Sequence, residues 1–319
     1  MRVRFWGTRG SIPVALTSAD ILHKIEQALT LAIARGVDSP EKLQNFIEHD
    51  LGFGISHTYG GHSSCVELET GRAEYLACDL GSGARALGTN IMSRHDGGPP
   101  PVINVIMSHL HWDHIMGFPF FAPAYVPGAR IRIHGCHDVL EQAFRLQQSA
   151  PCFPVDFSRL AADIEFVQLR AGAGYDVAGF KVTPKLQRHT GDSYGYRFER
   201  DGKIVVYSTD SEHKLEDPGE TRGFVEFFRN ADLVIFDSMY SLLDAVSVKE
   251  DWGHSSNIVG VEIAQMANVK HLCMFHHEPA FDDERIESML KETIRLEKLT
   301  RTRQPLKITA AYDGMEIEL

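Results

Sequence analysis

The sequence lacks the features that mark a membrane or secreted protein. No apolar run approaches the roughly 18 residues of a membrane-spanning helix. The opening residues, MRVRFWGTRG, are typical of a short strand and a turn rather than a signal peptide. The five cysteines are scattered, odd in number and without CxxC spacing. We therefore expect a cytoplasmic protein with reduced thiols and no membrane partner.

Positive charge is also scarce. The 319 residues include 32 Lys and Arg against 43 Asp and Glu, which gives a formal net charge of -11. The average field of such a chain repels polyanions, so the charge disfavours nucleic acid as a partner. A bound pair of divalent cations would offset about four negative charges, and part of the acidity can therefore belong to a metal site.

Short apolar runs alternate with turn signals and helical stretches along the chain. The expected strands are 3–6, 65–68, 75–78, 102–107, 131–133, 164–169, 180–185, 195–198, 204–208, 233–236, 271–275 and 307–311. That many strands, mixed with helices, predict a layered α/β protein, with residues 1–319 as one domain.

A helical insert is expected at residues 15–55, between the turn GTRGSIPV and the run SCVELE. Thr17 and Asp20 fit a capping box, Gly36 is placed to end the first helix, and Ser39 with Pro40 begins a second. Propensity leaves three roles open for the insert, namely a lid, a dimer contact or decoration. A homodimer is therefore one of the assemblies that the sequence allows.

The segment MSHLHWDHIMGF carries the strongest chemical signal, because it holds three histidines and an aspartate within six positions. Neutral imidazole and carboxylate are ligands for zinc, manganese and iron alike. His109 and His111, two residues apart at the expected strand end, point the same way. Asp113 and His114 come after the chain turns and can face a second position nearby. The spacing suits two metal ions better than one.

The HxHxDH run resembles the signature of the metallo-β-lactamase-fold hydrolases. GTRGSIPV followed by YGGHSSCVEL resembles the opening of their phosphodiesterase branch, which includes tRNase Z and cyclic-phosphate phosphodiesterases, and AYDGMEIEL resembles the closing strand. The resemblance covers nearly the whole chain apart from the insert. It implies a four-layer αββα sandwich with two divalent metal ions at one edge of the sheets. Zinc is favoured, with manganese or iron as alternatives.

The resemblance also implies further ligands. RHTGDSYGYRFE is similar to the segment of the family's next ligand, so His189 would join His109 and His111. VVYSTDSEH is similar to the strand end that supplies the bridging carboxylate, which implies Asp210.

The last ligand is either His276 or His277 in HLCMFHHEP, because neighbouring side chains on a strand face opposite ways. Alignment with the family's strand that ends in one histidine favours His276, beside Asp113 and His114. Asp79, in CDLGSGAR, matches an aspartate that supports the ligand histidines, although a turn-forming aspartate is the alternative.

Hydrolysis of a phosphodiester by a hydroxide shared between two cations still requires a proton for the leaving alkoxide. The turn GHSS is similar to the turn that carries a general-acid histidine in the phosphodiesterase branch, which implies that role for His254. The acidic residue that holds it matches Asp237, where tRNase Z has glutamate. The alternative is that His254 belongs to a helix cap. Asp113 completes the expected catalytic set.

Substrate size is predicted from a missing segment. tRNase Z carries a long RNA-binding arm between its equivalents of His189 and Asp210, whereas only about twenty residues separate them here. Together with the net charge, this predicts a small, for example cyclic, phosphodiester and makes nucleic acid unlikely. A thioester or lactone hydrolase and a non-enzymatic metal-dependent sensor remain as alternatives. His57 and His62 are expected at the pocket rim.

Overall fold

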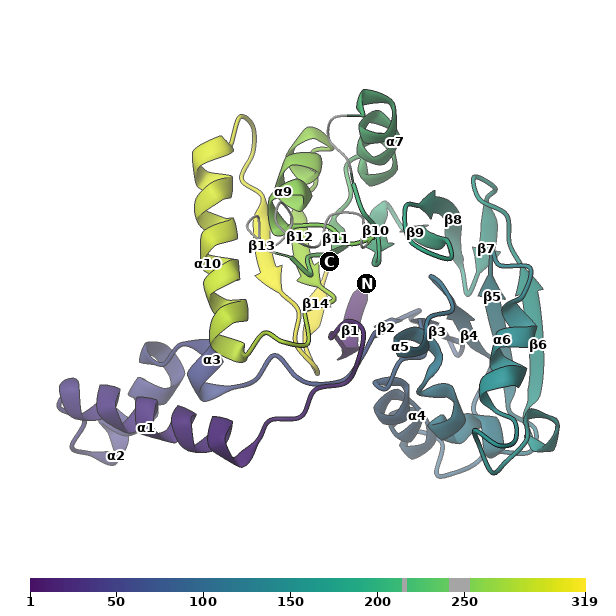
Figure 1. Ribbon diagram of the computed structural model, residues 1–319, viewed down its shortest axis with the longest axis horizontal. Coiled ribbons are helices and arrows are strands. Elements are labelled where there is room, and N and C mark those ends of the chain that lie inside the picture. The colour runs from purple at the N-terminus through teal and green to yellow at the C-terminus, as the bar shows by residue number, and fades with distance from the viewer. Residues whose placement is uncertain (214–216, 241–252) are drawn as a thin grey trace.

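The computed structural model describes residues 1–213, 217–240 and 253–319, and this part of the chain forms two mixed seven-stranded sheets (Figure 1). The first has the order β14 (Glu316–Glu318), β1 (Arg2–Gly7), β2 (Cys65–Leu68), β3 (Tyr75–Cys78), β4 (Ile103–Ile106), β5 (Arg130–Gly135) and β6 (Asp163–Gln168). The second has the order β13 (Lys307–Ala310), β12 (His271–Phe275), β11 (Leu233–Asp237), β10 (Lys203–Ser208), β9 (Ser193–Arg200), β8 (Phe180–Gln187) and β7 (Tyr175–Val177).

The two sheets pack face to face around a hydrophobic core. Val205 and Tyr207 of β10 point into this core, whereas Val206 faces the other way, because side chains alternate along a strand. Helices cover both outer faces: α7 (Pro218–Phe228), α9 (Asn257–Met266) and α10 (Asp283–Thr300) on the second sheet, and α4 (Ala84–Ser93) and α6 (Leu140–Gln147) on the first. The predicted four-layer sandwich is confirmed.

Strand direction brings distant segments to one edge of the sandwich. β3 is parallel to β4, and β11 is parallel to both β10 and β12. β9 is antiparallel to β8 and to β10, so β8 runs in the same direction as β10. The carboxyl ends of β8, β10, β11 and β12 therefore lie on the same side of the second sheet.

The helices expected in residues 15–55 are present. α1 (Ser18–Ala34) starts with the Thr17–Asp20 capping box, and α2 (Pro40–Asn45) starts at the Ser39 cap. A π-helical turn (Phe46–Asp50) and α3 (Phe53–Ser56) complete the segment. Figure 1 shows α1 and α2 at the foot of α10, away from α5 (Trp112–Ile115), which follows β4. Within the described residues, no helix is both long enough and apolar enough to span a membrane.

Candidate metal centre

The seven side chains expected as ligands meet at the edge where the strands end, in two groups. The histidine group consists of His109, His111 and His189, and the acidic group consists of Asp113, His114, Asp210 and His276. Within each group the potential ligand atoms lie within 4.8 Å of one another. Segments that are far apart in the sequence thus supply one constellation.

Asp210 follows β10 and belongs to the acidic group, but it also faces the histidine group. Its Oδ1 atom is 3.6 Å from Nε2 of His109 and 3.9 Å from Nε2 of His189. Its Oδ2 atom is 3.1 Å from Nε2 of His114 and 3.2 Å from Nε2 of His276. One carboxylate oxygen therefore faces each group.

The donor atoms of the histidine group suit a divalent cation. Nε2 of His109 is buried and has no hydrogen-bond partner among the described residues. Burial lowers the pKa of His109, His111 and His189. These imidazoles therefore favour the neutral form, which is the form that binds metal ions.

The acidic group concentrates negative charge. Burial by itself would lower the pKa of His114, but the carboxylates of Asp113 and Asp210 raise it well above its usual value. Nε2 of His276 lies 3.3 Å from Oδ2 of Asp113 and is the last potential ligand atom of the acidic group. A cation bound among these carboxylates would neutralise their charge, so the residues present fit a metal ion here as well.

Asp79, which follows β3, holds the acidic group from behind. Its Oδ1 accepts a hydrogen bond from the backbone N–H of Ser108 at 2.7 Å. Its Oδ2 accepts from the hydroxyls of Ser108 and Tyr207, both at 2.7 Å, and lies 2.8 Å from Nδ1 of His114. This contact engages Nδ1 of His114 and leaves Nε2 for the acidic group, so Asp79 orients a proposed ligand as well as forming a turn.

The choice between His276 and His277 follows from their contacts. His277 lies 2.8 Å, through Nε2, from the carbonyl oxygen of Ala311, and burial lowers the pKa of His277 to about 3. His276 instead lies beside Asp113 and Asp210. The structure therefore brings His276, and not His277, into the acidic group.

Three residues of the centre have a left-handed backbone. The φ angle is 60° at Asp79, 47° at Asp210 and 61° at His276, and each residue directly follows or closely follows a strand. Asp and His tolerate this conformation better than most residues other than glycine, at a cost on the order of 1–3 kcal/mol each. The turn at each position aims the side chain at the centre.

His254 and Asp237 form a pair next to the acidic group. Nδ1 of His254 is 2.8 Å from Oδ2 of Asp237, and the His254 ring stacks on His276 with centroids 5.2 Å apart. Burial disfavours the imidazolium, but the carboxylate of Asp237 raises the pKa of His254 to about 9. The backbone N–H of Met239 donates to Oδ1 of Asp237, which holds the carboxylate in place.

Comparison with known proteins identifies the family. Residues 81–277 match the family model described as the beta-lactamase superfamily domain. The chain belongs to this superfamily. The matched residues include both groups of the metal centre and the His254–Asp237 pair.

Curated relatives of this superfamily member are named ribonuclease Z and ribonuclease BN. Ribonuclease Z of Oceanobacillus iheyensis is 21% identical over 248 residues, which cover 62% of this chain and 78% of that protein. Ribonuclease BN of Proteus mirabilis is 22% identical over 237 residues, which cover 59% of this chain and 75% of that protein.

Solved structures share the fold along the whole chain. The metallo-beta-lactamase fold protein YhfI from Bacillus subtilis has a TM-score of 0.66 at 17% identity, covering 100% of this chain and 98% of that one. A diphosphatase of the PhnP family has a TM-score of 0.60 at 17% identity, covering 100% and 97%. The short form of human tRNase Z has a TM-score of 0.58 at 18% identity, covering 100% and 99%. The chain is thus a metallo-β-lactamase-fold hydrolase, related in sequence to ribonuclease Z and ribonuclease BN.

The expectation that nucleic acid is an unlikely partner is wrong, because the curated relatives of this hydrolase are ribonucleases by name. That expectation rests on the net charge of -11 and on the short segment between His189 and Asp210. Net charge is a property of the whole surface, whereas a phosphodiester meets the local field of the site, to which bound cations would add positive charge.

One contact at the centre, between Ser11 and Asp113, could not be predicted from the ligand pattern of the superfamily. The backbone N–H of Ser11, in the loop after β1, donates to Oδ2 of Asp113 at 2.8 Å. A Cβ atom at Gly10 would lie 2.5 Å from the His276 ring, so glycine lets this loop approach the acidic group. The letters GTRGS predict a turn, but its close approach to the acidic group depends on the fold.

The remaining histidines lie outside both groups. His62 is half-buried, with Nδ1 3.2 Å from the Ser82 hydroxyl, and His57 stacks on Phe53. Other histidines are buried, such as His134, or exposed, such as His49. Among the described residues, none of these histidines joins a potential metal-binding group.

Proposed function

We propose that the chain hydrolyses phosphodiesters with two divalent metal ions, one held by the histidine group and one by the acidic group. The observation that supports this best is the position of Asp210, whose two oxygens face different groups. When bound, such ions lower the pKa of a water nucleophile and bind phosphate oxygens. All proposed ligands lie outside residues 15–55, so we treat residues 1–319 as one catalytic domain with a helical insert.

In this proposal His254 donates the proton to the leaving alkoxide. Asp237 engages Nδ1 of His254, so Nε2 is the atom that presents a proton to a substrate. The carboxylate of Asp237 raises the pKa of this imidazole and so favours its protonated form. Asp237 is a positioning residue, because its carboxylate orients the ring and stabilises the imidazolium.

The proposed substrate class is nucleotide phosphodiesters, in RNA or as small cyclic diesters. The names of the relatives support RNA. Trp112 supports a nucleotide, because it lies between His111 and Asp113 and 71% of it is exposed. Stacking of a base on an aromatic side chain contributes about 1–3 kcal/mol, so a tryptophan at this place favours substrates that carry a base.

The reaction class can be tested with metal-reconstituted protein. Two ions per chain by elemental analysis are expected, together with turnover of RNA, 2′,3′-cyclic and 3′,5′-cyclic nucleotides, or linear nucleotide diesters in preference to bis(p-nitrophenyl) phosphate. Exclusive turnover of thioesters or lactones would contradict the phosphodiesterase proposal. A fully loaded protein that turns over no diester would instead indicate a ligand sensor. A single bound ion would contradict the dinuclear site.

The role of His254 has its own test. His254→Ala should reduce turnover of a diester with an alkoxide leaving group by roughly 10²–10⁴-fold. The same variant should retain most of its activity on a nitrophenyl diester, whose leaving group needs little protonation. His49→Ala serves as the control at an exposed histidine outside both groups. Equal losses on the two substrates would remove His254 from the acid role.

A further inference from the structure

A cavity of about 600 Å³ lies between the loop after β1 and the turn GGHSS. Residues 13–16 of the loop line it, together with residues 60–62 of the turn and Asp313. Its volume falls within the range of small-molecule sites, roughly 300–1,000 Å³. Ala15 and Leu16 belong to the helical insert, so the insert contributes one wall of this cavity.

The loop that lines the cavity also contacts the acidic group. The backbone N–H of Ser11 donates to Oδ2 of Asp113 at 2.8 Å. Pro13 follows two residues later, so its Cα atom lies at most about 7 Å from that of Ser11. A substrate whose phosphate is bound at the metal centre can therefore place a neighbouring group in the cavity.

His62 lies on the side of the cavity opposite the loop. Its Nδ1 atom is 3.2 Å from the hydroxyl of Ser82, which leaves Nε2 as the ring atom available to a ligand. Gly81, next to Ser82, packs against the metal centre, since a Cβ atom there would lie 2.3 Å from the backbone oxygen of Asp113. His62 thus connects the cavity with the acidic group.

Asp313 adds a second polar side chain to the cavity. Its Oδ2 atom accepts hydrogen bonds from the backbone N–H groups of Gly61 and His62, both at 2.9 Å. Its Oδ1 atom lies 3.2 Å from the hydroxyl of Thr8. Each carboxylate oxygen has two lone pairs, so Oδ1 can also accept a hydrogen bond from a ligand. A ligand with hydrogen-bonding groups at one edge therefore fits this cavity better than a purely apolar one.

We infer that this cavity binds a base of the nucleotide substrate, with His62 as a specificity-determining residue. The inference rests on the proposed phosphodiesterase function and adds the position of one nucleoside. A base has flat apolar faces and an edge with hydrogen-bond donors and acceptors. The apolar residues of the loop match the faces, and His62 and Asp313 match the edge. Trp112 is not among the residues that line the cavity, so it would stack on a different base.

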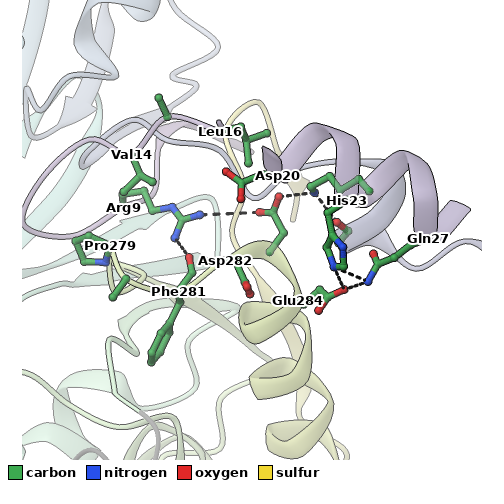
Figure 2. A pocket seen from close by; sticks show the side chains of 15 residues that line it. Arg9, Val14, Leu16, Asp20, His23, Gln27, Pro279, Phe281, Asp282 and Glu284 are labelled. Carbon is green, nitrogen blue, oxygen red and sulfur yellow. Dashed lines mark hydrogen bonds and ion pairs between the residues drawn. The ribbon is translucent and has the colours of Figure 1, made fainter. Parts of the chain in front are cut away.

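A second cavity, on the far side of the loop, favours one orientation of the ligand. Val14 and Leu16 also line this cavity, which has a volume of about 180 Å³ and lies between α1 and α10 (Figure 2). Figure 2 shows the carboxylates of Asp20, Asp282 and Glu284 around it. Negative charge there disfavours a phosphate, so the phosphate faces the metal centre and the uncharged base faces the loop.

The basic residues of the second cavity do not offer a phosphate site. Lys24 donates to the carboxylate of Asp283 at 2.5 Å. Arg9 donates to the backbone oxygens of Gly60 and Phe281, at 2.9 and 2.7 Å. Both cations are therefore already engaged within the protein, and the second cavity remains acidic.

Binding of a nucleoside tests the cavity without hydrolysis. Adenosine, which carries no phosphate, should bind the metal-loaded protein with a dissociation constant of about 1 mM, measured by calorimetry or NMR titration. His62→Ala should weaken binding about tenfold, as expected for the loss of a hydrogen bond. Ala15→Phe places a ring in the cavity and should abolish binding. Ala19→Phe, at an exposed alanine of α1 outside the cavity, is the control and should bind as wild type does.

Kinetics connects the cavity with the reaction. For a dinucleoside diester, His62→Ala should raise KM about tenfold and leave kcat nearly unchanged. For bis(p-nitrophenyl) phosphate, which carries no base, neither constant should change. Equal effects on the two substrates would give His62 a structural role and overturn the inference.

Failure of the base site and failure of the proposed function give different results. If no diester is turned over but Ala15→Phe abolishes adenosine binding, the base site stands and the hydrolase proposal fails. If diesters are hydrolysed but adenosine does not bind at about 10 mM, ten times the expected constant, the inference is wrong. Equal binding by wild type and both cavity variants would also overturn it, as would binding of hexanamide, a neutral acyl probe, in place of adenosine.

Discussion

The candidate metal centre and helix α1 differ in where they place polar and apolar side chains. At the centre, buried polar groups such as Asp79 are surrounded by partners contributed by distant strands. On α1, local sequence forms the helix, its polar side chains Lys24 and Gln27 contact α10, and its apolar side faces solvent. The centre thus buries polar groups among many partners, whereas α1 leaves apolar groups in contact with water.

The comparison predicts that substitutions in one region leave the other unaffected. The largest effect on metal content and turnover is expected at Asp210. Asp210→Asn removes the negative charge that faces both groups, so we expect loss of at least one bound metal ion and a fall in turnover of roughly 10³-fold or more. Elemental analysis and single-substrate kinetics measure both. Asp217→Asn, at an exposed helix cap, is the control. Full metal content and full turnover in Asp210→Asn would show that this carboxylate does not join the groups.

A smaller effect is expected at Asp79, which contacts the proposed ligand His114 rather than a metal ion. Asp79→Asn keeps the shape of the side chain but weakens the contacts to Ser108, Tyr207 and His114. Metal affinity should fall about 10–100-fold, as measured by competition with a chelator. Tyr207→Phe removes one of these donors and should have the smaller effect of the two. If metal affinity is unchanged in Asp79→Asn, then Asp79 is only a turn residue.

The smallest effect on chemistry is expected on α1. Lys24→Met preserves the length of the side chain but removes its hydrogen bonds to Gly54, His57 and Asp283. Hydrogen exchange of the α1 amides should become faster, consistent with a local loss of about 1–3 kcal/mol, while turnover stays at the wild-type level. Arg145→Met, which breaks an exposed ion pair with Glu141 on α6, should change neither. A fall in turnover as large as that of Asp79→Asn would show that the two regions are coupled.

The sequence was informative where local patterns determine structure. A strand end places His109 and His111, and the Thr17 capping box marks the start of α1, whereas Asp210 came from the resemblance to the family. It could not choose between His276 and His277 from alternation alone, because the choice depends on a left-handed turn and on the carbonyl oxygen of Ala311, which is 34 residues from His277.

Long-range contacts were beyond the reach of local patterns. The Ser11 contact with Asp113 joins residues 102 positions apart, and Lys24 meets Asp283 across 259 positions. The outward orientation of α1 follows from the second of these contacts. The charge argument against nucleic acid failed for a related reason, since an average over the whole surface does not describe a local site.

The left-handed turns at Asp79, Asp210 and His276 limit which substitutions are accessible to evolution or to design. A β-branched residue at any of the three positions would be sterically strained, whatever the chemistry of its side chain. Asparagine fits the same backbone, and glycine fits it without strain but has no side chain to offer. At the two proposed ligands among them, Asp210 and His276, the backbone conformation therefore limits which replacement ligands the fold accepts.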